Sequence, residues 1–136
     1  MSRIIPCFLC VFLLLAFSGC GGDKVPLKGK VTFKEDGSPL TRGMVCFETD
    51  TFRARGTLNS DGTYQVTSVK DNDGIPPGFY KVYIFGAEDS VEDAPGMNAA
   101  RSASLVAAKY TNKETSGISV EVDAKTKQFD FQVEKP

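Results

Sequence analysis

The feature that most restricts the fold is a set of short stretches in which apolar and polar residues alternate. In residues 27–34, every second position is apolar or glycine, whereas the intervening positions are lysines and a threonine. A period of two residues predicts a β-strand with one buried and one exposed face. Seven such stretches lie at residues 27–34, 41–49, 52–59, 63–69, 79–86, 118–123 and 127–133. Because no strong helical pattern interrupts them, the sequence predicts an all-β sandwich of seven strands.

Turn signals separate these stretches. The pair Asp36–Gly37 is typical of a hairpin, and residues 71–78 combine prolines and glycines in a loop. Residues 87–108 break the alternation, since they are first acidic and then rich in alanine and serine. We expect an exposed loop insertion over residues 87–108, with residues 98–110 as its one candidate helix.

The beginning of the chain has a different composition. Arg3 supplies a positive charge, residues 4–17 are mostly apolar, and Ser18 and Gly19 precede Cys20. The apolar stretch is shorter than the ~20 residues that cross a bilayer as a helix. A positive start, a short apolar centre and small residues at its end are typical of an export signal.

The sequence from Phe17 to Cys20 resembles the lipobox of bacterial lipoproteins, although Phe17 stands where leucine is usual. The resemblance implies cleavage before Cys20, a diacylglycerol on its sulfur and a further acyl chain, such as palmitate, on the new amino group. Two or more acyl chains hold a protein stably on a membrane. Residues 1–19 are then a signal peptide, residues 20–25 the lipidated cysteine with a flexible tether, and residues 26–136 the β-sandwich domain. The alternative is a plain export peptide cut nearby, with Cys20 incidental.

Four pieces of the chain, in this order, resemble small lipoproteins with a transthyretin-like fold. They are GKVTFKEDGSPLTRGMVCFE, GTLNSDGTYQVTS, PPGFYKVYI and KYTNKETSGISVEV. These lipoproteins are abundant in planctomycetes and are related to carboxypeptidase regulatory-like domains. The resemblance implies a seven-stranded Greek-key sandwich that is exported, lipid-anchored in the cell envelope, and directed to the periplasm or the cell surface. It implies no known reaction.

The composition argues against several kinds of chemistry. Histidine is absent, so the usual general base at neutral pH and the commonest metal ligand are missing. Cys46 is the only cysteine after Cys20, which excludes a disulfide framework and the usual zinc sites. Asp71 and Asp73 lack the further oxygen ligands of a calcium loop, so their segment is better interpreted as a turn. We expect no enzymatic activity, no cofactor and no metal.

Charge also limits the partners. The chain has 16 basic and 17 acidic residues. A protein that binds nucleic acid needs a basic surface to neutralise phosphates. We therefore expect no nucleic acid partner.

The most apolar strand of the domain, at residues 79–85, has apolar side chains on both faces. Phe79, Tyr83 and Phe85 share one face with Lys81, and Tyr80, Val82 and Ile84 share the other. One face enters the core, and the other needs a cover or a partner. Residues 87–108 could fold over the aromatic face, which is the favoured alternative because loops often cap sheets. Otherwise Phe79, Tyr83 and Phe85 form an exposed strip that docks a glycan or another protein.

Cys46 lies between Val45 and Phe47. If these two neighbours face the core, the thiol lies on the opposite face of its sheet. It then either forms an intermolecular disulfide or is a small, buried and inert side chain, and we favour the second alternative.

The two resemblances imply a lipid-anchored module of the cell envelope, and the composition favours a structural or binding role without catalysis. Its expected partners are the membrane, through the lipid on Cys20, and an envelope protein or a glycan. The alternative function is a carbohydrate-binding module that uses the aromatic rings of Phe79, Tyr83 and Phe85.

Overall fold

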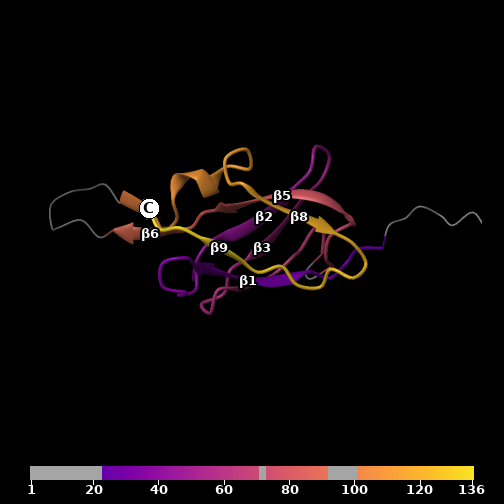
Figure 1. The fold of residues 1–136 in the computed structure, drawn as a ribbon, viewed down its shortest axis with the longest axis horizontal. Coiled ribbons are helices and arrows are strands. Elements are labelled where there is room, and N and C mark those ends of the chain that lie inside the picture. Colours follow the sequence, from indigo (N-terminus) through magenta and orange to yellow (C-terminus); the bar gives the residue numbers. More distant parts are fainter. Residues whose placement is uncertain (1–22, 71–72, 92–100) are drawn as a thin grey trace, which may run out of the picture.

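A computed structural model describes residues 23–70, 73–91 and 101–136 (Figure 1). These residues form β-strands and one short 3₁₀ helix, η1 (Ala108–Thr111). The strands are β1 (Lys28–Phe33), β2 (Met44–Glu48), β3 (Arg53–Thr57), β4 (Thr63–Gln65), β5 (Gly78–Phe85), β6 (Glu88–Val91), β7 (Arg101–Ser104), β8 (Ile118–Val122) and β9 (Phe131–Val133). The predicted all-β class is confirmed, whereas the leader and Cys20 lie outside the described residues.

The strands form two main sheets and one hairpin. A three-stranded sheet has the order β4-β1-β9, in which β1 is antiparallel to β4 and parallel to β9. A four-stranded sheet has the order β3-β2-β5-β8 and is antiparallel throughout. Strands β6 and β7 pair only with each other and project from one end of the molecule (Figure 1).

The core lies between the two main sheets, and the alternation in the sequence decides which side chains enter it. In β1 the buried positions are Gly29, Val31 and Phe33, and in β5 they are Tyr80, Val82 and Ile84. Phe47 of the four-stranded sheet meets Tyr64 of the three-stranded sheet with their ring centroids 6.0 Å apart. Each fully buried large apolar side chain contributes about 1.5–3 kcal/mol, so this shared core holds the sheets together.

The turn at Asp36–Gly37 forms, but the expectation that it joins β1 and β2 in a hairpin is wrong, because these strands belong to different sheets. Gly37 adopts a φ of 69°, and the returning chain makes only one bridge, between Thr32 and Pro39. The next residue, Leu40, is fully buried. Because Leu40 is buried in the core, the chain passes from the three-stranded sheet to the four-stranded sheet. Strand β2 therefore belongs to the four-stranded sheet.

The described part of residues 87–108 is a hairpin rather than the expected exposed loop. Strands β6 and β7 pair from Glu88 with Ser104 to Val91 with Arg101. The expected helix over residues 98–110 is also wrong, because its described residues form β7 and most of η1. Alanine-rich composition favours a helix, but strand pairing and the almost complete burial of Val106 override this preference.

The N-terminal end of the described chain is bound to the sandwich. The Val25 N–H donates to the Ile75 carbonyl over 2.8 Å, and the Ile75 N–H donates to the Val25 carbonyl over 3.0 Å. Lys24 forms an ion pair with Asp73. The sequence places Lys24 and Val25 in a flexible tether, yet these contacts fix both residues. In Figure 1 the indigo start of the described chain lies at the end of the molecule opposite β6.

Candidate functional site on the outer face of the four-stranded sheet

The three aromatic residues singled out in β5 all lie on the outer face of the four-stranded sheet. Phe79 is 62% exposed and Phe85 is 59% exposed, whereas Tyr83 is half-buried. The favoured expectation that residues 87–108 cover this face is therefore wrong for both phenylalanines.

The three rings do not form one continuous strip. Phe79 and Phe85 are six positions apart on one strand, which corresponds to about 20 Å. Between them lie Lys81, whose ammonium binds Glu114 over 2.7 Å, and the half-buried Tyr83. A planar ligand therefore cannot stack on both phenylalanines at once.

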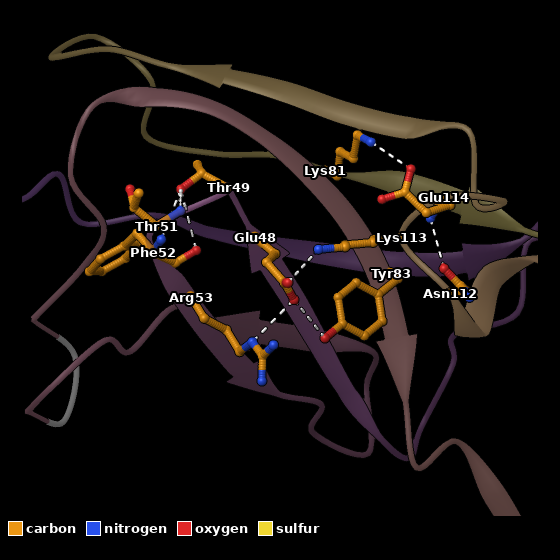
Figure 2. A network of polar contacts seen from close by, with 10 residues as sticks. All are labelled: Glu48, Thr49, Thr51, Phe52, Arg53, Lys81, Tyr83, Asn112, Lys113 and Glu114. Atoms are coloured by element: carbon orange, nitrogen blue, oxygen red, sulfur yellow. Dashed lines mark hydrogen bonds and ion pairs between the residues drawn. The ribbon is translucent and has the colours of Figure 1, made fainter.

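Glu48 is the centre of a polar network on this face (Figure 2). Its carboxylate accepts from the Lys113 ammonium at 2.6 Å, from the Arg53 Nε–H at 3.1 Å and from the Tyr83 hydroxyl at 3.2 Å. The strand register produces part of this arrangement, because Glu48 at the end of β2 lies directly opposite Arg53 in β3. The Glu48 side chain is only 11% exposed, so the network closes over it.

The network fixes the charges of its members. The Lys113 ammonium lowers the pKa of Glu48 from 4.5 to about 2, with Arg53 and Tyr83 acting in the same direction. The same carboxylate raises the pKa of Lys113. Burial, followed by the neighbouring Cys46 and Glu48, raises the pKa of Tyr83 to about 12. A general base needs a pKa near the working pH, so this group of residues is suited to holding charges in place rather than to transferring protons.

A hollow of about 210 Å³ opens beside the network. Its lining combines one aromatic ring with charged and polar side chains: Glu48, Thr49, Asp50, Phe79, Lys81, Lys113 and Glu114. The loop that carries Lys113 is held in place by a turn in which the Glu114 N–H donates to the Asn112 side-chain oxygen over 2.8 Å (Figure 2). An exposed ring beside fixed donors and acceptors is a general means of binding a polar ligand with an apolar face.

Cys46 lies on the same outer face but is buried. Its neighbours Val45 and Phe47 are fully buried on the core side, whereas Cys46 itself is 6% exposed and free of any disulfide. Burial is the main cause of its raised pKa. The favoured interpretation of Cys46 as a buried side chain is therefore confirmed.

The carboxylate of Asp73 is occupied by hydrogen bonds within the chain, whereas a calcium loop needs carboxylate oxygens that face the ion. Its Oδ1 accepts from the Ser68 N–H at 2.7 Å, and its Oδ2 accepts from the Val69 and Lys70 N–H groups at 3.1 and 3.0 Å. The Lys24 ammonium lies 2.5 Å from the same Oδ2 and is the main cause of the lowered pKa of Asp73. Asp71, the other predicted ligand, lies outside the described residues. Within the described ranges, no three potential metal-ligating side chains come together.

Sequence analysis found the aromatic members of the site but not the Glu48 network. The alternation around Cys46 places Glu48 on the outer face, but Lys113 follows 65 residues later in a loop. Only the β2–β5–β8 arrangement brings them together. Cys20, the predicted lipidation site, lies outside the described residues.

Comparisons with known proteins do not identify the family of the chain. No family model and no curated protein matches it. Among solved structures, the chain is similar to a DUF3823 family protein from Bacteroides ovatus ATCC 8483, with a TM-score of 0.46 and 17% identity. The similarity covers 82% of this chain and 45% of that chain, so this chain spans less than half of that protein. Within the described residues, no helix is long and apolar enough to cross a membrane.

Proposed function

We propose that this chain is a lipid-anchored β-sandwich module of the cell envelope, directed to the periplasm or the cell surface, which works by binding and not by catalysis. The anchoring rests on the resemblance of Phe17–Cys20 to a lipobox. The binding role is supported by the exposure of Phe79 beside a hollow whose charged groups are held in fixed positions. The absence of catalysis is supported by the lack of histidine and by the low pKa of Glu48.

We further assign the domain to the seven-stranded Greek-key sandwich of the transthyretin type. The ordered sequence pieces given above support this assignment. The division of seven strands into sheets of three and four strands, with the first and last strands side by side, also supports it. In this assignment the β6–β7 hairpin is an insertion between β5 and β8.

Carbohydrate binding is the second candidate function, and the exposure of Phe79 is the observation that favours it. An aromatic ring offers an apolar platform to the apolar face of a sugar, while the surrounding polar groups can bind its hydroxyls. The site would be the hollow beside Phe79 rather than the whole strip, because the paired Lys81 and the half-buried Tyr83 interrupt the apolar surface between Phe79 and Phe85.

A pull-down of the full chain with insoluble peptidoglycan tests this site. Phe79→Ala should reduce the bound fraction about tenfold, since loss of a stacking ring at the centre of a site typically costs more than 1 kcal/mol. Phe85→Ala is the matched control, because it removes an equally exposed ring from the same strand away from the hollow. Equal binding by the two variants, or no binding by the unaltered chain, would contradict peptidoglycan as the ligand of this hollow.

The anchor is tested separately by mass spectrometry of the protein isolated from bacterial membranes. A peptide that begins at Cys20 and carries diacylglycerol and an acyl chain is the expected product. Cys20→Ser should release the protein from the membrane fraction. An unmodified N-terminus in the native product would refute the anchor.

A further inference from the structure

The end of the sandwich at which the chain enters is organised around Asp73. Its carboxylate binds the Lys24 ammonium and the N–H groups of Ser68, Val69 and Lys70. The bridge between Val25 and Ile75 adds a second connection. Residues 24–25 are therefore fixed to residues 68–70 and to Asp73 and Ile75.

Chain length then limits where this end can lie. The inference rests on the proposed lipid anchor at Cys20. Lys24 lies four positions after Cys20, and a fully extended chain spans at most about 3.6 Å per position. Lys24 thus lies within about 14 Å of the anchored cysteine, whatever the tilt of the domain. Val69 and Lys70, which share Asp73 with Lys24, must also lie close to the membrane surface.

The side chains at this end suit a lipid surface. Val69 is 79% exposed, more than any other large apolar side chain in the described residues. The Lys28 N–H donates to the Lys127 carbonyl over 3.3 Å, which places the turn bearing Lys125 and Lys127 next to β1. Lysine side chains can extend along an interface and place their ammonium groups at lipid phosphates.

The ion pairs differ between the two ends. Within the described residues, no carboxylate lies within salt-bridge distance of four exposed lysines at the chain-entry end, namely Lys28, Lys70, Lys125 and Lys127. Near the hairpin end, by contrast, Arg42 binds Asp89 and Lys135 binds Asp36. These four lysines are thus available to an external anion, whereas Lys24 at the same end is paired with Asp73.

We propose that this end docks directly on a phospholipid membrane with anionic headgroups. Val69 enters the interface, and Lys70, Lys125 and Lys127 contact lipid phosphates. Asp23 directly precedes Lys24, and Asp123 accepts a hydrogen bond from the Lys125 N–H, so carboxylates lie among these lysines. The attraction therefore comes from individual lysine–phosphate contacts rather than from a strongly positive field. The β6–β7 hairpin then points away from the membrane.

A single tryptophan tests the docking, because the natural chain contains none. Val69→Trp would be made in the full, lipidated protein and reconstituted into vesicles of phosphatidylglycerol and brominated phosphatidylcholine. We expect bromine to quench the fluorescence of the introduced indole strongly. Phe85→Trp is the control, since residue 85 is also exposed but lies toward the hairpin, and it should be quenched little.

Charge reversal tests the lysines. In the Val69→Trp background, Lys125→Glu with Lys127→Glu should lower the ratio of docked to undocked protein by about fivefold or more for each lysine. Arg42→Glu with Lys135→Glu makes the same charge change at the other end and should have little effect. Salt at about 1 M should weaken docking as the reversal of Lys125 and Lys127 does, because it shortens the Debye length to about 3 Å.

Weak and equal quenching of the two tryptophan variants would overturn the docking, and equal effects of the two charge reversals would overturn the role of the lysines. Mass spectrometry of the same sample separates the two proposals. A lipidated Cys20 with unquenched Val69→Trp refutes docking alone. An unmodified Cys20 refutes the anchor and, with it, the docking.

Discussion

At the level of single residues, Glu48 determines how the outer face of the four-stranded sheet holds its charges. Replacing it by Gln keeps the volume but leaves Lys113 and Arg53 facing an uncharged amide. We expect Glu48→Gln to lower the free energy of unfolding by about 1–2 kcal/mol at pH 7, a value reduced for the partial exposure of its partners. Urea denaturation measures this change.

The pH dependence of the same variant follows from the lowered pKa. Glu48 titrates at about 2 in the folded chain instead of 4.5, so its stabilisation is complete above pH 4.5 and disappears as the pH falls toward 2. The stability difference between the natural chain and Glu48→Gln should shrink over this interval. Glu121→Gln, at an exposed position on β8, should show no comparable effect; a matching effect would contradict the role of the network.

Cys46 is expected to be unreactive while the chain is folded. Its 6% exposure and its raised pKa both reduce the amount of accessible thiolate, which is the reactive species. Alkylation by iodoacetamide at pH 8 should therefore proceed only as fast as the protein opens, and it should become rapid in urea. Rapid labelling without denaturant, or a disulfide-linked dimer on a non-reducing gel, would disprove this expectation.

At the level of elements, the contact of β1 with its neighbours depends on Gly29. A Cβ at this position would lie 1.8 Å from the Phe129 carbonyl oxygen and 2.6 Å from the Tyr64 hydroxyl, which donates to that same carbonyl. Gly29→Ala would push the backbone of β1 away from the backbone at Phe129. It should therefore destabilise the fold by about 3 kcal/mol. Gly78→Ala is the control, because its nearest neighbour would be 3.5 Å away. Thermal unfolding compares the two.

The sequence predicts the faces of the strands better than their partners. Alternation correctly assigns the buried and exposed positions of β1, β3 and β5, because each side chain's burial depends on the pleat of its own strand. It fails after Asp36–Gly37, where a local turn signal does not specify which sheet receives the next strand. It fails again over residues 87–108, where pairing of β6 with β7 is a tertiary outcome that composition does not reveal.

The candidate site shows the same division. The outward positions of Phe79 and Phe85 follow from periodicity within β5. The contact of Glu48 with Lys113 does not, since it joins a strand end to a loop far along the chain. The burial of Glu48 and the hollow beside Phe79 depend on that contact, so neither is visible in the sequence.

At the level of the whole molecule, Asp73 connects the entering chain to the sandwich. Asp73→Ala removes the acceptor of the Val69 and Lys70 N–H groups and the partner of Lys24. We expect amide hydrogen exchange at Val69 and Lys70 to become about tenfold faster or more, as loss of hydrogen bonds to a charged acceptor predicts. NMR measures these rates residue by residue. Asp61→Ala, which removes a similar acceptor from another turn, should leave them unchanged.

The parallel pairing of β1 with β9 also determines how the domain resists mechanical force. Because the two strands run in the same direction, the chain enters at one end of the pair and leaves at the other (Figure 1). A pull applied at Lys24 and Glu134 would slide the strands past each other and strain their hydrogen bonds together instead of opening them one by one. Resistance to such shear is governed by the rate of unfolding rather than by equilibrium stability, a property that would suit a domain carried by the lipid anchor proposed at Cys20.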